Sequence, residues 1–391
     1  MKRISAFLLV ATASVVAPAC DPGVDGPGDG TTDPDDPTNP ADEWNKKLDA
    51  RKPDYNAALR IASLRLIGEL PTMTQINLVA NAADDAGKKA AYEGLVDSFL
   101  ADPRFSRQMM VYFRDLFRMG GTVNTVDLET APAFAASLAV ANDSYMKLLT
   151  ATTGTCPTFN AATNTFTAAN CANNVTTHAG VLTNPGMNAH FTSNFAFRRV
   201  DWVQRTFNCQ KFPADLSETP ETYGGKLYTG KFPWLSVAGK TNGGRVDFHD
   251  VQSVVCMGCH NVMNHIAPLF ANFNETGQMT AAIAVKTPLG ANDLARATDF
   301  LPAGEPFAYR LGQATPDLPS LGTAMAADPE VARCAVKRFV NWAQGKEEIT
   351  TALTLVPDTV IQTQTEAFVA SGFKIKDLIR GVFTSDDFVK F

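Results

Sequence analysis

The sequence predicts a mainly α-helical protein. Apolar residues recur at three- and four-residue intervals along most of the chain, and the alternating pattern of β-strands is scarce. At 391 residues, with 45% hydrophobic and 19% charged residues, the chain is an ordinary globular protein long enough for more than one domain. We expect a helical N-terminal domain over residues 46–153, a loop-rich central region over 154–245 and a helical C-terminal domain over 246–391. A net charge of -6 provides no basic surface for nucleic acid, so nucleic-acid binding is not expected.

The first 19 residues have the pattern of an export signal. Lys2 and Arg3 precede an apolar run over about residues 4–16, and the small residues 17–19 offer a cleavage site before Cys20. The run is too short to span a bilayer. Small residues followed by a cysteine resemble the cleavage site of bacterial lipoproteins, so we expect a lipid on Cys20 and a periplasmic or cell-surface location on a bacterial membrane. Secretion without a lipid is the alternative.

Residues 20–45 are expected to form the lipid anchor and a disordered acidic tether. Segment 21–43 contains seven Asp, one Glu, five Pro and four Gly, and it has no basic residue. Such a composition cannot bury enough apolar surface to fold. The tether would hold a folded body away from the membrane.

Residues 54–153 contain a series of helical patterns. In DYNAALRIASLRLIG one stripe carries the apolar side chains of Leu59, Ala62 and Leu66. A second helix is predicted in PTMTQINLVANA, where Thr72 and Gln75 have the spacing of a capping box. Further helices are predicted over KKAAYEGLVDSFLAD, over PRFSRQMMVYFRDLFRMGG and, as a single helix, over PAFAASLAVANDSYMKLLTAT.

The remainder of the chain divides into a loop-rich and a helical part. Residues 154–245 are rich in Gly, Asn, Thr and Pro, and we expect one helix there, around Phe197–Phe207. Three more helices are predicted over residues 329–344, 359–370 and 375–382.

The cysteines divide into three groups. Of seven, Cys20 is assigned to the lipid and two belong to the motif described next, which leaves Cys156, Cys171, Cys209 and Cys334. An even number in an exported protein predicts disulfides. Cys156 and Cys171 bracket a polar excursion that needs a local bridge, and the pair Cys209–Cys334 follows by elimination.

The segment VVCMGCHNVMNHIAPLF, residues 254–270, contains C-x-x-C-H at Cys256, Cys259 and His260. This spacing lets two thiols add to the vinyl groups of one haem while the adjacent imidazole ligates the iron. Attachment of this kind follows export, in agreement with the N-terminal signal. The motif therefore predicts one covalent haem c, held by Cys256 and Cys259, with His260 as the iron ligand.

Three other interpretations of the motif remain open. A zinc site could use His260 and His265, but the spacing expected of zinc fingers is absent. A thioredoxin-like redox dithiol needs a βαβ setting that the surrounding sequence lacks. A plain structural disulfide is the third alternative.

The sequence offers several candidates for the sixth iron ligand, the one opposite His260. Met325 is the first candidate, because it is expected in a loop just before a helix and a methionine opposite histidine is common in electron-transfer cytochromes. Met279, His249 and His265 are alternatives, and Met263 is expected in the apolar wall.

The segment CHNVMNHIAPLFANFNETG resembles the haem segment of planctomycete-type cytochrome proteins. The pattern expected in that family is CHxxMDPxGFxxENFDxxG. Matching positions are Cys259, His260, Met263, Asn272, Phe273 and Gly277. The resemblance extends in collinear order over about residues 54–391, through stretches such as RRVDWVQRTFNC and RCAVKRFVNWAQGKEEI. It implies a mainly helical fold, a cytochrome c-like C-terminal domain and a single haem, and that group also has cysteines at the positions of Cys209 and Cys334. The D-P-x-G-F part is absent here, where Asn264 and His265 replace Asp and Pro.

Together these features predict an exported monohaem c-type cytochrome that transfers single electrons to or from an unidentified redox partner protein. A peroxidase-like enzyme is one alternative, for which His249 and Arg245 could supply the distal acid–base pair. A surface binding module with a structural haem is another. No hydrolase or nucleotide-binding motif occurs in the sequence.

Overall fold

The computed structural model describes residues 46–47, 50–210, 212, 221–223, 226–228, 254–287, 293–310, 312–345 and 356–391. For residues 221–223, 226–228 and 254–258 it describes the backbone alone. Cys20, Arg245 and His249 lie outside the described residues, as do the expected signal peptide and most of the tether. The chain divides into two compact units, Met1–Arg51 and Lys52–Phe391, and the fold described below is that of the second unit.

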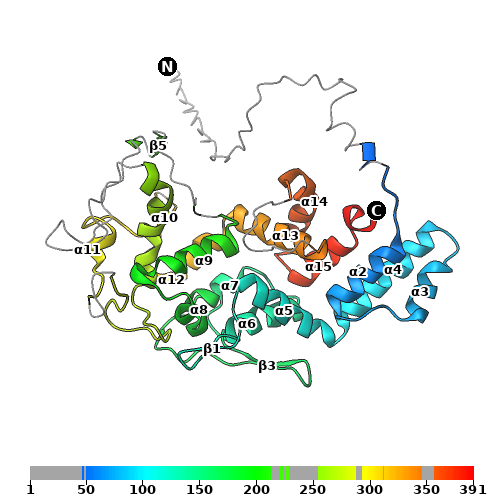
Figure 1. The fold of residues 1–391 in the computed structure, drawn as a ribbon, viewed down its shortest axis with the longest axis horizontal. Helices are drawn as coiled ribbons and strands as arrows, with labels where there is room; N and C mark the ends of the chain where they lie inside the picture. The colour runs from blue at the N-terminus through cyan, green and yellow to red at the C-terminus, as the bar shows by residue number, and fades with distance from the viewer. Residues whose placement is uncertain are drawn as a thin grey trace, which may run out of the picture. The chain divides into compact units, whose positions relative to one another are not determined.

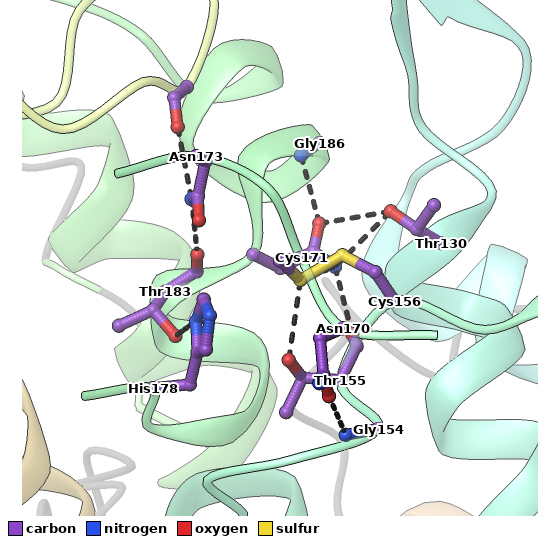
Figure 2. Close-up of a disulfide and its surroundings, with 12 residues drawn as sticks. Thr130, Gly154, Thr155, Cys156, Asn170, Cys171, Asn173, His178, Thr183 and Gly186 are labelled. Atoms are coloured by element: carbon purple, nitrogen blue, oxygen red, sulfur yellow. Dashed lines mark hydrogen bonds between the residues drawn. A yellow bond between two sulfur atoms is a disulfide. The ribbon is translucent and has the colours of Figure 1, made fainter. Parts of the chain in front are cut away.

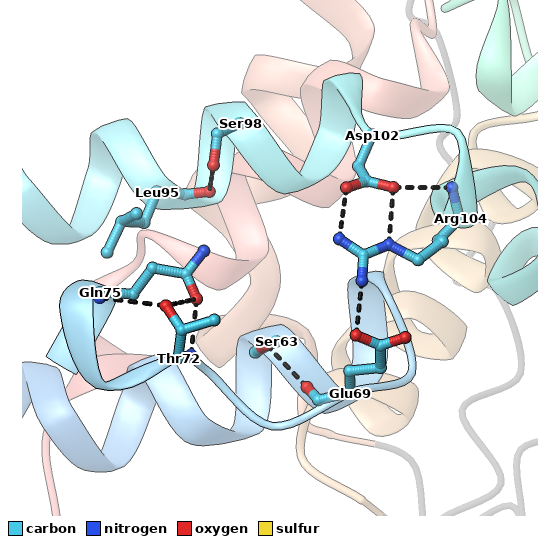
Figure 3. Close-up of polar contacts among 8 residues, drawn as sticks. All are labelled: Ser63, Glu69, Thr72, Gln75, Leu95, Ser98, Asp102 and Arg104. Atoms are coloured by element: carbon cyan, nitrogen blue, oxygen red, sulfur yellow. Dashed lines mark hydrogen bonds and ion pairs between the residues drawn. The ribbon is translucent and has the colours of Figure 1, made fainter.

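The prediction of a mainly α-helical protein is confirmed (Figure 1). The first four helices of the compact unit are α2 (Tyr55–Leu66), α3 (Met73–Ala80), α4 (Asp85–Ala101) and α5 (Arg104–Phe117). Helix α3 begins with the predicted capping box, in which the Gln75 backbone donates to Thr72 Oγ1 and the Thr72 backbone donates to Gln75 Oε1 (Figure 3). Both contacts satisfy N–H groups that have no partner within the helix.

A salt bridge joins the loop after α2 to the start of α5. The Arg104 guanidinium pairs with Asp102 at 2.6 Å and with Glu69 at 2.5 Å (Figure 3). The hydrogen bonds from Arg104 lower the pKa of the Asp102 carboxyl. All three side chains are partly or fully exposed, so the contribution to stability is modest.

The prediction of a single helix over residues 132–152 is wrong. The structure has α6 (Thr130–Val140) and α7 (Lys147–Thr150), with a turn between them. Asn142 lies in this turn with a φ of 52°, a left-handed conformation that Asn adopts more readily than most residues. The Asn142 amide also accepts from the Lys376 backbone and donates to Asp377, which ties the turn to the C-terminal helices.

The central region holds the predicted helix α9 (Phe197–Phe207). It also holds a short helix that was not predicted from the sequence, α8 (Pro185–His190), and two 3₁₀ turns, η1 (Gly180–Thr183) and η2 (Asn194–Ala196). Strands in the described part of the chain form two-stranded antiparallel pairs: β1 (Thr122–Val123) with β2 (Val126–Asp127), β3 (Thr158–Asn160) with β4 (Thr165–Thr167), β5 (Glu221–Tyr223) with β6 (Lys226–Tyr228), and β7 (Ala308–Arg310) with β8 (Gln313–Ala314).

The C-terminal part begins with α10 (Val254–Phe270), which contains the C-x-x-C-H motif. It continues with α11 (Ala297–Phe300), α12 (Leu318–Ala326), α13 (Pro329–Ala343), α14 (Asp358–Ala370), α15 (Ile375–Phe383) and α16 (Asp386–Val389). Helices α13, α14 and α15 confirm the three predicted helices to within a residue or two at each end.

The helices before residue 153 and those after residue 246 share one hydrophobic core. Helix α15 packs against α4, α6, α13 and α14. The Tyr92 hydroxyl of α4 donates to the carbonyl of Phe383 at 2.7 Å, and Lys52 exchanges two backbone hydrogen bonds with Phe391. The two ends of this unit are therefore held together, so the helical regions expected from the sequence form a continuous body.

Both predicted disulfides, Cys156–Cys171 and Cys209–Cys334, are present in the structure. The first closes the base of the β3–β4 hairpin and lies beside Thr130 and Thr155 (Figure 2). The second joins Cys209, two residues beyond the C-terminal end of α9, to α13, across a sequence separation of 125 residues.

A buried histidine lies near the first disulfide. His178 Nδ1 is 3.3 Å from Thr183 Oγ1, and the hydroxyl also accepts from the Ala179 backbone (Figure 2). The His178 side chain is 8% exposed, and burial lowers its pKa from the ordinary 6.5. A neutral imidazole at neutral pH follows from this environment.

Removing the long-range disulfide should destabilise the protein more than removing the local one. The variant Cys209→Ala with Cys334→Ala is expected to lose about 5 kcal/mol of unfolding free energy, and Cys156→Ala with Cys171→Ala about 3 kcal/mol, because the longer loop restricts the unfolded chain more. Urea unfolding followed by circular dichroism measures both. A larger loss from the Cys156–Cys171 pair would contradict this ranking.

The free energy of unfolding should fall as the pH drops below 6.5. The folded state resists protonation of His178, whereas the unfolded chain takes up the proton, so stability is full above the unfolded pKa and declines until the pH reaches the folded pKa. Substitution of His178 by Gln should reduce this slope between pH 7.5 and 5.5. Part of the slope should remain, because burial also lowers the pKa of His190 and of His260. An unchanged slope in urea titrations of the variant would refute the assignment.

Candidate functional site

The C-x-x-C-H motif lies in the first half of α10. Positions 256, 259 and 260 are three and four residues apart, so they occupy one face of the helix. The structure describes the backbone alone at Cys256, and Cys259 and His260 are half-buried. The helix thus brings the three predicted attachment positions together on a single stripe.

The His260 imidazole is held from two directions. Its Nδ1 lies 2.9 Å from Asn264 Oδ1, one helical turn further along α10. Its ring meets the Phe197 ring edge to face, with centroids 5.1 Å apart and an interplanar angle of 86°. An imidazole that donates from Nδ1 to an amide oxygen carries its lone pair on Nε2.

Burial keeps this imidazole neutral. Desolvation lowers the pKa of His260 below its ordinary 6.5, and the hydrogen bond to Asn264 opposes the shift only in part. A neutral histidine is the form that binds a metal ion. The arrangement around His260 is therefore suited to an axial ligand that uses Nε2.

Three phenylalanines form an apolar wall beside His260. The rings of Phe195 and Phe197 stack at 5.6 Å, and Phe300 meets both at 5.7 and 6.2 Å. The wall depends on unusual backbone, because Phe195 and Ala196 have φ values of 56° and 58°. Left-handed conformations of this kind cost about 1–3 kcal/mol each in residues other than glycine. The Phe195 backbone donates to the carbonyl of Lys286, which helps to hold the strained turn.

A buried arginine connects α9 to the end of α10. The Arg199 guanidinium is fully buried and makes five hydrogen bonds to backbone carbonyls. The acceptors lie at the C-terminal ends of two helices and in the turn that follows α10: Asn188, Phe270, Phe273 and Asn274. Burial lowers the pKa of Arg199 to about 9, so the side chain is still charged at pH 7.

Arg199 was not predicted as a site residue, although its position in the sequence of α9 indicates that its side chain is buried. It lies three and four residues before the buried Trp202 and Val203, so it falls on the apolar stripe of the helix. A charged residue on a buried stripe needs several hydrogen-bond partners. Helix α9 packs on α10, so the bonds from Arg199 to the end of α10 hold the helix whose Phe197 meets His260.

The segment after α10 approaches α8 closely. Gly277 has a φ of 68°, and a Cβ at this position would lie 2.0 Å from the Pro185 carbonyl oxygen. The buried Asn173 amide donates to the carbonyls of Thr183 and Gly277, and so also joins the segment after α10 to the turn before α8 (Figure 2). Gly277 thus has a structural reason for its residue type, because a side chain there would meet the Pro185 backbone.

The structure corrects the expected setting of Met325. It lies within helix α12, where Asp317 caps the first turn and Pro319 follows at the second position, instead of in a loop. Its side chain is fully buried, and α12 packs on α7, η1 and β7. Whether it ligates iron stays a prediction.

The other ligand candidates differ in their surroundings. Met279 is half-buried and lines a cavity of about 390 Å³, together with Thr183, Pro268, Leu269 and Phe273. In the described residues the lining of this cavity includes neither Cys259 nor His260, and Pro268 is about 12 Å along the helix axis from His260. His265 Nδ1 contacts the Asn261 carbonyl and its Nε2 contacts Glu305 at 2.9 Å. Ligation by His265 would require the ring nitrogen that binds the iron to give up its contact. Met263 is partly buried and packs against the core.

Within the described ranges, no three His, Cys, Asp or Glu side chains cluster so that they could hold a metal ion. No described helix is long and apolar enough to cross a membrane. Comparison with family models, with curated proteins and with solved structures found no match to this chain.

Replacing Arg199 by Met should destabilise the protein strongly. The substitution keeps an unbranched apolar stem but leaves four carbonyls, three of them in buried contacts, without this donor, and a loss of about 3–5 kcal/mol is expected. The neighbouring Arg198→Met is the matched control, because Arg198 is exposed and its guanidinium only covers the Phe191 ring at 6.0 Å. A loss below about 1 kcal/mol is expected for the control. Equal losses in thermal or urea unfolding would show that Arg199 does not anchor α9 to the end of α10.

Proposed function

We propose that this protein is an exported monohaem c-type cytochrome of the planctomycete type, attached to the membrane through a lipid on Cys20, which transfers single electrons. The observation that supports this most is the placement of Cys256, Cys259 and His260 on one face of α10 with His260 held as a neutral imidazole. When bound, a haem supplies a couple that accepts and returns one electron.

The residues present fit the chemistry of such a group. The thiols of Cys256 and Cys259 would each form a thioether with a vinyl group, and His260 Nε2 would ligate the iron. Asn264 holds the imidazole plane, and Phe197, backed by Phe195 and Phe300, covers one side of the ring. Low water access and controlled hydrogen bonding are the means by which a protein sets a haem potential.

The disulfides support the proposed compartment. Cys156–Cys171 and Cys209–Cys334 lie outside the motif, and disulfides persist in oxidising compartments such as the periplasm or the cell surface. Attachment of haem to C-x-x-C-H takes place in the same setting. The acidic segment after Cys20 would serve as the tether between the lipid and the body.

Met325 is proposed as the sixth ligand, with Met279 as the alternative. A methionine opposite His260 would give a six-coordinate iron suited to electron transfer. Met325 is rigidly held in the core, whereas Met279 follows α10 in a loop and borders an open cavity. Ligation by Met325 would therefore require part of the core to move, whereas ligation by Met279 would require movement of a loop.

Mass spectrometry of the mature protein, produced in a host that matures c-type cytochromes, tests the proposal. The wild-type polypeptide should carry the mass of one covalent haem, and Cys259→Ala should lose at least one of its two thioethers. Cys156→Ala with Cys171→Ala is the matched control and should keep the haem, because that pair lies outside the motif. Absence of the added mass from the wild-type protein would refute the cytochrome.

The same preparation separates electron transfer from an open catalytic or sensing iron. A six-coordinate, low-spin iron should leave the reduced spectrum unchanged when carbon monoxide is added. Ready binding of carbon monoxide would still agree with a bound haem, but it would contradict electron transfer as the activity.

A further inference from the structure

We propose that Asn264 sets the reduction potential of the haem by accepting the Nδ1 proton of His260. The inference rests on the proposed function and adds a residue with a definite task to it. Asn264 acts through His260 and is therefore a positioning residue that does not itself touch the iron.

The geometry supplies the first argument. Asn264 and His260 are four residues apart on α10, so their side chains share a face, and Oδ1 lies 2.9 Å from Nδ1. The Asn264 side chain is 3% exposed, so water has little access to replace the acceptor. The strength of this hydrogen bond is therefore decided by the protein.

The residue type supplies the second argument. Asn is a poor helix former, and a buried amide is costly unless it is hydrogen-bonded. Ala267, three residues further along the same face of α10, is completely buried, so an aliphatic side chain at position 264 would suit the packing of this face at least as well. Packing alone does not account for an amide at position 264, whereas an acceptor for His260 does.

The chemistry of the ligand supplies the third argument. A partner that accepts more strongly from Nδ1–H makes the imidazole more basic and a better donor to iron, which favours the oxidised state. A neutral amide oxygen lies between a carboxylate, which accepts more strongly, and an aliphatic group, which does not accept. The potential should therefore move in opposite directions when Asn264 is replaced by these two types.

Potentiometric titration of the holoprotein tests this inference. Asn264→Asp should shift the equilibrium with a fixed redox mediator about tenfold toward the oxidised protein, which is a fall of about 59 mV in the reduction potential. Asn264→Leu should shift the equilibrium toward the reduced protein, which is a rise in the reduction potential. Asn261→Asp is the matched control, because it adds the same charge beside His260 on a half-buried position outside the Nδ1 contact. A smaller shift is expected for this control.

The outcomes distinguish the inference from the proposed function. A protein without covalent haem refutes the cytochrome itself. A loaded protein whose two Asn264 variants move the potential in the same direction, or no further than Asn261→Asp does, refutes the role of Asn264 and leaves the cytochrome standing.

A second measurement needs neither the variants nor the haem. Nitrogen-15 NMR of histidine-labelled apoprotein, shown to be folded by circular dichroism, should find the proton of the neutral His260 ring on Nδ1, where Asn264 Oδ1 accepts it. A proton on Nε2 would overturn the inference even if the Asn264 variants failed to fold or to mature.

Discussion

The arrangement of the candidate site depends on one buried cation. Among the described residues, Arg199 has no carboxylate as a hydrogen-bond partner, and its charge is balanced by carbonyl groups at the ends of α8 and α10. Carbonyls at helix C-termini carry partial negative charge that favours a cation. Because Phe197 precedes Arg199 by two residues on the same helix, the contact that anchors α9 also places an aromatic ring against His260. Packing, charge and the site are thus linked through a single side chain.

The surroundings of His260 combine rigid and strained elements. The left-handed Phe195 and Ala196 are unfavourable for the backbone, and they persist because the Arg199 contacts and the ring cluster determine the conformation around them. Strain of this kind is common where a protein must hold a ligand in one orientation. In this protein the strained turn precedes Phe197, which stacks on Phe195 and meets the His260 ring.

Much of the fold could be predicted from local patterns, whereas the site required long-range contacts. The apolar stripes of α2 and α9, the capping box at Thr72 and the polar excursion between Cys156 and Cys171 are visible over a few residues. The break between α6 and α7 depends on Asn142 bonding to residues more than 230 positions away. The partners of Arg199 likewise lie up to 75 positions away, so only its place on an apolar stripe was visible. The motif identifies His260, but the partner at Asn264 emerges only once α10 is known to be helical through both residues.

A crystal structure of the mature protein, purified from a host that matures c-type cytochromes, would be the sharpest test of the haem site. We expect a porphyrin joined to Cys256 and Cys259, with iron on His260 Nε2, Asn264 on Nδ1 and the Arg199 guanidinium still bonded to the carbonyls at the end of α10. Iron bound through another side chain in place of His260, or an α10 that is unwound between residues 256 and 264, would contradict this expectation.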